Sequence, residues 1–363
     1  MMLPKPKKKK FWCRKMSEKN KSDIFQYRGA IHIHTLFSDG TGTVDSISKA
    51  AKKAGLKWII ITDHNSLEVE EGIFNGVYVL KGNEISLVEN HYLTIDVKEV
   101  IEATENPRIY VNKTREIGGF GFAAHPDESL SRKNHVKPLR WLDKSIVPDG
   151  VEIWNWFSAW GDKYDESNIF TKAYTFLFNK RLVTLPHRET LAWWDSLNKN
   201  TEKIVPAIFG VDAHAIKVKG YILPLKAFPY KSSFKTLQNM ICLREQLSDD
   251  FETAKKQIFN ALKSGNNLMV NNYLSSDIPE ISFSNSEGSV FGGEKINLDE
   301  NTFLNIKFNK KLEIKIYRYD NEIVTAKSKD FTLKIEQEGK YRAEILYKNR
   351  GFVYTNPVIV TKN

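Results

Sequence analysis

Cysteine is the scarcest residue type in this chain, with two copies among 363 residues. Cys13 lies in a basic N-terminal stretch, and Cys242 lies in a segment that we expect to be helical. Two such distant thiols argue against the disulfide framework that is typical of small secreted proteins. They fit a reducing compartment, although two cysteines do not prove one.

Long apolar runs are also absent. No stretch reaches the roughly 20 residues that a transmembrane helix needs. No apolar segment of about 7–15 residues follows the basic start, as it would in a secretory signal. We therefore expect a cytoplasmic protein without a transmembrane segment, whereas a signal missing upstream of this start would place the protein outside the cytoplasm.

Positive charge is sparse once the N-terminus is set aside. The formal net charge is +10, but residues 1–22 hold nine Lys or Arg residues against one Glu. The other 341 residues carry a net charge of only +2. Such a nearly neutral body lacks the basic groove that binds long nucleic acid. We expect residues 1–24 to be a disordered basic arm, either a solvated tail or an electrostatic contact to acidic lipid or nucleic acid.

Strand-like and helix-like patterns alternate between residues 30 and 270. Lys57 to Thr62 is a continuous apolar run, as in a strand buried on both faces. The rhythm of strand, polar tip and helix recurs about seven times, which is typical of an α/β parallel sheet or barrel. The expected strands are 30–34, 57–62, 77–86, 91–97, 120–124, 150–155 and 204–210. The expected helices are 43–56, 107–117 and 251–263, and a long helical region is expected from about 162 to 198.

The pattern changes from Ile281 onward to short alternating strands that turn residues separate. These strands are expected at 302–308, 312–320, 322–327, 330–336, 340–348 and 351–362. Their number and spacing indicate a small antiparallel β-sandwich of the Ig-like kind. We therefore divide the chain into the arm at 1–24, an α/β domain at 25–275 and a β domain at 276–363.

Two histidines, His32 and His34, lie in the first expected strand. Because residues two apart in a strand point to the same face, their imidazoles project together. Asp39 follows in a Ser-Asp-Gly loop that can bring a carboxylate close to them. Such a pair suits one metal ion, but two histidines satisfied by the structure around them would explain it equally well.

Other potential metal ligands occur in matching places along the chain. At or just past the C-terminal ends of expected strands lie His32, His34, His64, His125, Asp212 and His214, with Glu84 in its own strand segment. In a β/α barrel these strand ends form one rim, where active sites are built. We therefore predict a shared metal centre at that rim.

The ordered set HIHT, SDG, ITDHN, GNE, AAHP and GVDAH resembles the polymerase-and-histidinol-phosphatase (PHP) superfamily of metal-dependent phosphoesterases. The resemblance covers roughly residues 28–270. The later ETLAWWD, an ALKSG helix and a β domain ending near YTNPVIV are similar to the CehA/McbA-type branch. The resemblance implies a distorted (β/α)7 barrel with up to three divalent metals at its rim.

The resemblance also implies nine metal ligands in three groups. The groups are His32, His34, Glu84 and Asp212; Glu84, His91 and His125, with Glu84 bridging two metals; and Asp39, His64 and His214. The catalytic roles fall to Glu84, Asp212 and His214. Two or three ions of Zn, Mn or Fe are the implied cofactors.

The chemistry agrees with these residue types. Mixed imidazole and carboxylate ligands suit Zn²⁺, Mn²⁺ or Fe²⁺ and fit poorly with Ca²⁺ or Mg²⁺ alone. A bridging carboxylate holds two cations about 3.5–4 Å apart, and a water between them loses a proton near neutral pH. The hydroxide can then attack phosphorus in line, while the metals neutralise phosphate charge. Asp63, beside His64, is expected to orient a ligand.

Other residues have plainer alternatives. The candidate substrate contacts are Arg28, His187, Arg188, Trp154 and Trp156. An arginine can clamp a phosphate bidentately, but a solvated or salt-bridged arginine is an equally ordinary finding. His187, like His135, is either a surface histidine or a phosphate contact or general acid. The two tryptophans would share one face of a continuing strand, where they either pack in the core or form an aromatic wall for a base or sugar ring.

Two polar residues complete the candidate rim. Glu152 and Asn155 end an expected strand, so they are expected to support the metal ligands or to join them. The sequence thus predicts an enzyme that hydrolyses a phosphate mono- or diester by attack of a metal-activated hydroxide. A small nucleotide or sugar phosphate is favoured as substrate, and the oligomeric state stays open. The alternatives are a phosphodiesterase or exonuclease on nucleic acid and a non-catalytic, metal-stabilised binding module.

Overall fold

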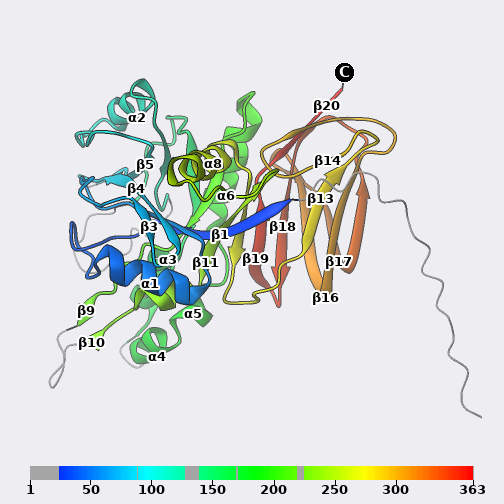
Figure 1. Ribbon diagram of the computed structural model, residues 1–363. Helices are drawn as coiled ribbons and strands as arrows, with labels where there is room; N and C mark the ends of the chain where they lie inside the picture. The colour runs from blue at the N-terminus through cyan, green and yellow to red at the C-terminus, as the bar shows by residue number, and fades with distance from the viewer. Residues whose placement is uncertain (1–23, 88, 127–138, 169–170, 219–224, 363) are drawn as a thin grey trace, which may run out of the picture.

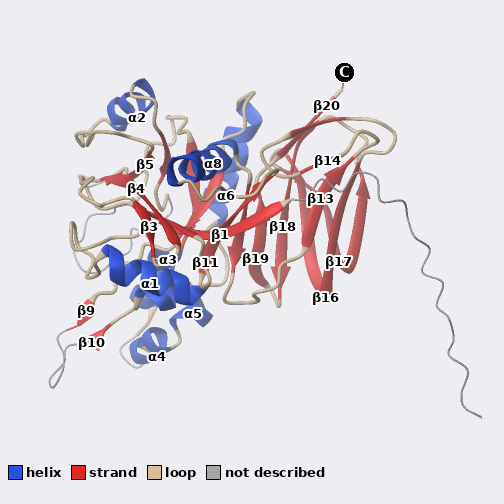
Figure 2. Ribbon diagram, in the orientation of Figure 1, coloured by secondary structure: helices blue, strands red, loops and turns tan. Residues whose placement is uncertain are grey.

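The computed structural model describes residues 24–87, 89–126, 139–168, 171–218 and 225–362. The basic arm predicted at 1–24 lies outside the described residues except for Ile24, and His135 lies outside them too. Helices and strands both occur up to residue 264, and the described chain beyond it contains strands and loops without a helix (Figures 1 and 2). The protein is therefore mixed α/β with two structural units. No helix among the described residues is long and apolar enough to cross a membrane.

Seven strands of the first unit form one continuous series, in which each strand is hydrogen-bonded to the next. They are β1 (Phe25–Ile31), β2 (Trp58–Ile61), β4 (Val77–Ile85), β5 (Tyr92–Ile95), β6 (Phe120–Ala123), β7 (Gly150–Asn155) and β8 (Ala207–Gly210). The pairs β1–β2, β2–β4, β6–β7 and β7–β8 are parallel. Strand β5 runs antiparallel to both β4 and β6. The expectation of parallel strands fails at β5 because the short link from β4 cannot form a parallel crossover, which takes about a dozen residues or more.

The last of these strands returns to the first. Past the end of β8, the Val211 amide donates to the Ile31 carbonyl over 3.1 Å. The His34 amide donates to the Ala213 carbonyl over 3.0 Å. The ends of β1 and β8 are thereby held side by side, immediately before the residues that the sequence marks as ligands.

Helices cover this unit, and three short strands join it at its margins (Figure 1). The helices are α1 (Val44–Ala54), α2 (Pro107–Glu116), α3 (Trp156–Glu166), α4 (Lys172–Leu177), α5 (Asn179–Leu182), α6 (Arg188–Asn200), α7 (Tyr230–Ser233) and α8 (Phe251–Ser264). The short strands are β3 (Gly72–Phe74), β9 (Lys217–Val218) and β10 (Leu225–Lys226). Strand β2 packs on both faces, with Ile59 and Ile61 in the core beneath α1, and Trp58 and Ile60 in the core beneath α8.

The helical region predicted from about 162 to 198 is interrupted, and it begins earlier than expected. The chain forms four helices there, α3 to α6, and α3 already begins at Trp156. The side chain of Asn155 caps α3 by accepting from the Ser158 amide over 2.9 Å, which starts the helix directly after β7. Pro186 lacks the amide that a continuous helix would need, so a new helix starts beyond it.

Two further strands extend the sheet beside β1. They are β11 (Leu237–Leu243) and β12 (Asn267–Asn271). Strand β11 pairs antiparallel with β1 and β12, so Cys242 lies in a buried strand and the prediction of a helix there is wrong. Side chains alternate along β11, with Ile241 in the core of the first unit and Met240 and Cys242 in the core of the second. The two units therefore share this part of the sheet.

The second unit consists of antiparallel strands and one parallel pair. Its strands are β13 (Glu280–Ser284), β14 (Ser289–Val290), β15 (Lys295–Asn297), β16 (Phe303–Arg318), β17 (Asn321–Lys334), β18 (Gly339–Tyr347), β19 (Arg350–Thr355) and β20 (Val358–Thr361). The four segments expected as strands between 302 and 336 do form strands, but the breaks expected within each pair are wrong, because they merge into the two long strands β16 and β17. Their pairing continues across a register shift between Lys307 and Leu312, where an irregularity takes the place of a turn.

A buried polar junction joins the second unit to β8. The Asn356 side chain accepts from the Ala207 amide over 2.6 Å and donates to the Ala207 carbonyl and to Asn267. A second junction pairs Arg342 with both carboxylate oxygens of Asp195, at 2.6 Å each. Strand β19 also pairs with β12. Hydrogen bonds therefore fix the two units against each other.

Asn356→Ala should lower the free energy of unfolding by about 1–3 kcal/mol, because it removes the acceptor of the buried Ala207 amide and one of the two donors to the Ala207 carbonyl. Urea unfolding followed by circular dichroism measures this loss. Asn301→Ala, at an exposed position of the same unit, is the control and should change the free energy by no more than about 0.5 kcal/mol. Equal effects of the two substitutions would show that the junction does not stabilise the fold.

Candidate metal centre

One buried carboxylate, that of Glu84 in β4, lies at the middle of the predicted ligands. The side chain is 1% exposed, and five imidazoles surround it. The nitrogen–oxygen distances are 3.1 Å for His32, 3.3 Å for His34, 3.3 Å for His64, 2.8 Å for His91 and 3.3 Å for His125. Six of the nine implied ligands thus meet at one group.

A second carboxylate, that of Asp212, faces Glu84 across the histidines. Its Oδ1 lies 3.5 Å from His32 Nε2, 3.3 Å from His34 Nε2 and 3.5 Å from His214 Nδ1. His34 Nε2 therefore lies 3.3 Å from both Glu84 and Asp212. The two histidines of the HIH motif point to the same pair of carboxylates.

Asp39 forms the solvent side of the cluster, with its side chain 56% exposed. Its carboxylate lies 3.2 Å from His214, and 3.7 Å from both His34 and His64. The rings of His34 and His214 stack with centroids 4.2 Å apart. The structure thus brings all nine implied ligands into one contiguous cluster.

The backbone is left-handed at three of these residues. The φ angles are 70° at His32, 29° at His125 and 49° at Asp212. Each residue follows shortly after a strand end. Non-glycine residues in this region are uncommon, and they concentrate at functional sites where the surrounding structure holds them. The conformation turns the side chains out of the strand direction and toward Glu84.

Glu152 and Asn155 of β7 hold the cluster from the protein side. Glu152 Oε1 lies 2.8 Å from His32 Nδ1, and its Oε2 accepts from the His125 amide over 2.7 Å. The Asn155 amide donates to Glu152 over 3.1 Å and to Asp212 over 3.3 Å. Gly210 makes room for this carboxylate, because a Cβ there would lie 1.5 Å from Glu152 Oε1. These residues support the ligands, as expected from their place at a strand end.

Hydrogen bonds from Tyr230 and Asp63 hold the loops that carry several of the ligands. The buried Tyr230 hydroxyl lies 2.8 Å from the His34 carbonyl oxygen and 3.0 Å from the His214 carbonyl oxygen, and it can donate to either. It accepts from the amides of Thr41 and Gly42. Asp63, which the sequence predicts to orient a ligand, contacts the loop of the implied ligand Asp39. Its carboxylate accepts from the amide and hydroxyl of Thr35 and from the Ser38 hydroxyl, so it holds the loop that carries Asp39.

Charge is strongly coupled inside the cluster. Burial alone would lower the pKa of His34, but the carboxylates of Asp212 and Glu84 raise it from 6.5 to about 9. The same balance, with Glu152 added, raises the pKa of His32 well above its usual value. Burial would raise the pKa of Glu84 and Asp212, yet the surrounding imidazoles hold both well below their usual values. The site therefore favours positive charge next to its carboxylates.

The residues present fit a metal centre. Both ring nitrogens of His34 are buried, and although Nε2 lies 3.3 Å from two carboxylates, neither nitrogen makes a hydrogen bond to a described residue. This is costly for an imidazole that has no other ligand. Sets of ligand atoms within 4.8 Å of one another are His34, Asp39, His64 and His214; His32, His34 and Glu84; His32, His125 and Asp212; and His64, Glu84 and His91. These sets divide the implied ligands differently from the resemblance, which placed His125 with Glu84 and His91. Imidazoles and carboxylates in such sets suit Zn²⁺, Mn²⁺ or Fe²⁺.

The two arginines among the substrate candidates lie outside this cluster. Arg28 donates to Gln238, to Asn272 and to the Ser276 carbonyl. Arg188 is the first residue of α6 and lines a separate pocket between the two units, together with Arg342. Neither Arg28 nor Arg188 therefore contacts a described residue of the cluster.

The tryptophan candidates are only 2% exposed. Trp156 starts α3, so it does not share a strand face with Trp154, and that part of the prediction is wrong. Trp154 packs edge-on against Phe209, although it also lines a pocket beside His125. The aromatic ring that reaches the cluster is Phe157, whose centroid lies 5.5 Å from that of His214. Helical periodicity after Asn155 was the signal that could have identified it.

His187 lies next to the cluster but not among its ligands. It lines a pocket with His125 and Asn155, and its Nε2 lies 3.2 Å from the buried carboxylate of Asp162. The sequence analysis did not single out Asp162. Its spacing of seven residues from Asn155 would have placed the two on the same face of a helix, had the start of α3 been recognised.

Gly210→Ala should weaken metal binding by about 10–100-fold, because the new methyl group displaces Glu152 from His32. Competitive titration with a metal-sensitive chelator measures the affinity. Gly288→Ala, where a Cβ meets no atom within 4 Å, is the matched control and should bind metal as the wild type does. Wild-type affinity in Gly210→Ala would contradict the supporting role of Glu152.

The metal-free protein should lose stability as pH rises from 6.5 to 9. His32 and His34 bind protons more tightly when folded, since their pKa values are raised. The stability that these protons contribute is complete below the ordinary value and disappears as pH passes through the folded value. Urea unfolding in a chelating buffer at several pH values tests this. A free energy of unfolding that stays constant or rises over this range would contradict it.

One family of known proteins matches the part of the chain that carries the cluster. The PHP domain family matches residues 30–216, just over half of the chain, and this range contains all nine implied ligands. An uncharacterized protein of Methanocaldococcus jannaschii is 28% identical over 180 residues, which are 45% of this chain and 96% of that protein.

Two solved structures are similar to this chain. One is a two-domain protein from Bacteroides vulgatus, described as containing a predicted PHP-like metal-dependent phosphoesterase, with 14% identity, a TM-score of 0.47 and coverage of 94% of this chain and 97% of that chain. The other, from Bifidobacterium adolescentis, is provisionally described as a metal-dependent phosphoesterase, with 16% identity, a TM-score of 0.31 and coverage of 56% and 93%. By the match of residues 30–216, the chain belongs to the PHP domain family.

Proposed function

We propose that the protein is a metal-dependent hydrolase of a phosphate mono- or diester. The observation that carries this proposal is the burial of Glu84 among five imidazoles, with Asp212 facing the same histidines. Nine residues would hold two or three ions of Zn, Mn or Fe. They are His32, His34, Asp39, His64, Glu84, His91, His125, Asp212 and His214.

When bound, such cations acidify a water and neutralise charge on the phosphate. The chain itself supplies the arrangement of the ligands. Glu84 Oε1 faces His91 and His125, and its Oε2 faces His32, His34 and His64, so its two oxygens address different histidines. That division supports a bridging role for Glu84. Asp212 and His214 continue the cluster toward the exposed Asp39 and complete the catalytic set.

We infer that the seven-strand circuit is the distorted barrel implied by the family resemblance. The domains then run from 25 to 275 and from 276 to 363, and the second is an Ig-like β domain. That domain offers no cluster of metal-ligating residues among those that the structure describes, which supports a role in packing or recognition. The predicted cytoplasmic location also stays a proposal.

A small phosphorylated substrate is favoured over long nucleic acid. Outside residues 1–22 the net charge is only +2, and phosphate-backbone binding depends on many cationic contacts. The pocket beside His125 and the exposed Asp39 offer room for a compact group at the cluster. A phosphodiesterase or exonuclease would instead show nucleic-acid binding that falls steeply with salt.

The wild-type protein supplied with Mn²⁺, Zn²⁺ or Fe²⁺ should hydrolyse a generic aryl phosphate. The double variant Asp212→Ala, His32→Ala should lose at least about 100-fold of this activity, because it removes ligands from adjoining sets. Initial rates of phosphate release measure both proteins, and circular dichroism checks that the variant is folded.

Asp45→Ala provides the control and should leave the rate unchanged, because among the described residues this exposed carboxylate pairs with Lys49 and Asn75, away from the cluster. Absence of hydrolysis by the wild type, with every metal and both classes of ester, would contradict the proposal. The non-catalytic binding module would then be the better description.

A further inference from the structure

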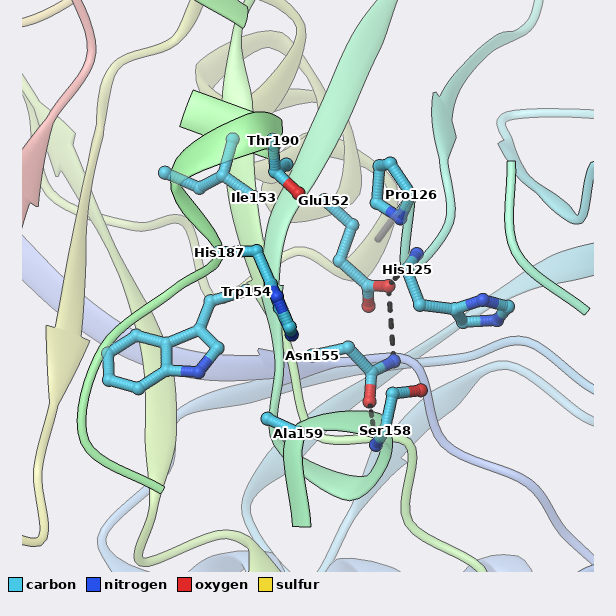
Figure 3. Close-up of a pocket in the computed structure, with 10 residues that line it drawn as sticks. All are labelled: His125, Pro126, Glu152, Ile153, Trp154, Asn155, Ser158, Ala159, His187 and Thr190. Carbon is cyan, nitrogen blue, oxygen red and sulfur yellow. Dashed lines mark hydrogen bonds between the residues drawn. The ribbon is translucent and has the colours of Figure 1, made fainter. Parts of the chain in front are cut away.

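A pocket opens beside the cluster on the side of β7 and α3. It is lined by residues that include His125, Glu152, Asn155, Ser158 and His187 (Figure 3). Among them, His125 belongs to the cluster, Glu152 contacts its member His32, and Asn155 contacts its member Asp212. A phosphate ester held at the cluster would therefore present a substituent to this pocket.

His187 lies on the wall opposite His125 in this pocket, with its ring directed toward Asn155 and Ser158 (Figure 3). It immediately precedes α6, and its side chain is 42% exposed. It can thus contact a substrate that enters the pocket. The buried histidines His32 and His34 are less suited to donate a proton, because their ring nitrogens contact Glu84.

Asp162 of α3 stands behind His187. Its Oδ2 lies 3.2 Å from His187 Nε2, and its side chain is only 4% exposed. A buried carboxylate at such a distance restricts the orientation of the imidazole ring. Asp162 follows Asn155 by seven residues, or two helical turns, so the same face of α3 serves the cluster and His187.

We propose that His187 is the general acid of the reaction and that Asp162 is the residue that positions it. The inference rests on the proposed phosphoesterase function. Water forms the new bond to phosphorus, the bond between phosphorus and the leaving oxygen breaks, and His187 Nδ1 gives its proton to that oxygen. Nε2 stays beside the Asp162 carboxylate, 3.2 Å away. The proton released by the attacking water restores the imidazolium, so protons and electrons balance.

The test compares leaving groups of different basicity. A general acid matters for a basic leaving oxygen and matters little for one that departs readily as an anion. His187→Gln should therefore lower kcat for phenyl phosphate by about 100-fold or more, while kcat for dinitrophenyl phosphate falls far less. Asp162→Asn should show the same selectivity in weaker form. Metal content, measured by mass spectrometry, should equal that of the wild type in both.

Glu189→Gln is the matched control, because Glu189 is exposed in the same turn and does not line the pocket. Equal losses for both esters in His187→Gln would overturn this inference and leave the proposed function standing. A wild type that hydrolyses neither ester would overturn the proposed function, and this inference with it. Hydrolysis of phenyl phosphate by His187→Gln at the wild-type rate would also overturn the inference.

A second readout does not depend on activity. The pKa of His187, followed by NMR of the imidazole, should fall in Asp162→Asn because the opposing charge is removed. It should stay unchanged in Glu189→Gln. An unchanged pKa in Asp162→Asn would overturn the positioning role of Asp162.

Discussion

The burial of the Glu84 carboxylate is the constraint on which the rest of the site depends. A carboxylate that is 1% exposed is costly unless positive charge and hydrogen-bond donors surround it. Five histidines supply that surrounding, and they come from four separate parts of the chain. To reach Glu84, the backbone adopts left-handed conformations at His32 and His125, and at Asp212, which faces the same histidines. The local strain, the shifted pKa values and the absence of a side chain at Gly210 all follow from the need to gather these groups around one buried charge.

The second structural unit braces the strands that carry the cluster. Strand β1, which ends just before His32, pairs with β11, and the sheet continues through β12 to β19 of the second unit. Strand β8, which ends shortly before Asp212, is held at its start by Asn356. The β domain therefore fixes the two strands whose ends must stay side by side for His34 and Asp212 to share contacts.

Most of the cluster could be predicted from the sequence, because its members follow strand ends and parallel neighbours bring such ends together. The same reasoning could not reveal β5, whose direction depends on the length of a connection rather than on periodicity. It missed the strand at Cys242, since β11 is buried on both faces and so lacks the alternation that identifies a strand. It placed Trp156 on a strand because β7 passes into α3 without a break, and only the cap at Asn155 marks the change. The pairing of Glu152 with His32 and of Asp162 with His187 depends on tertiary contacts that no spacing encodes.

Exposure within the cluster is graded, and the gradient determines how a substrate can approach. The side chains of His32, His34 and Glu84 are at most 1% exposed, His214 is 11%, His64 is 26% and Asp39 is 56% exposed. Among the described residues, the cluster is thus open to solvent at Asp39 and His64, and the pocket that His187 lines adjoins it at His125. Phe157 flanks His214 between these two sides, so an apolar surface separates them. A phosphate bound over the buried carboxylates would have one oxygen toward the open side and its ester substituent toward the His187 pocket. This polarity is what a hydrolase needs, because water and leaving group must occupy opposite sides of the phosphorus atom.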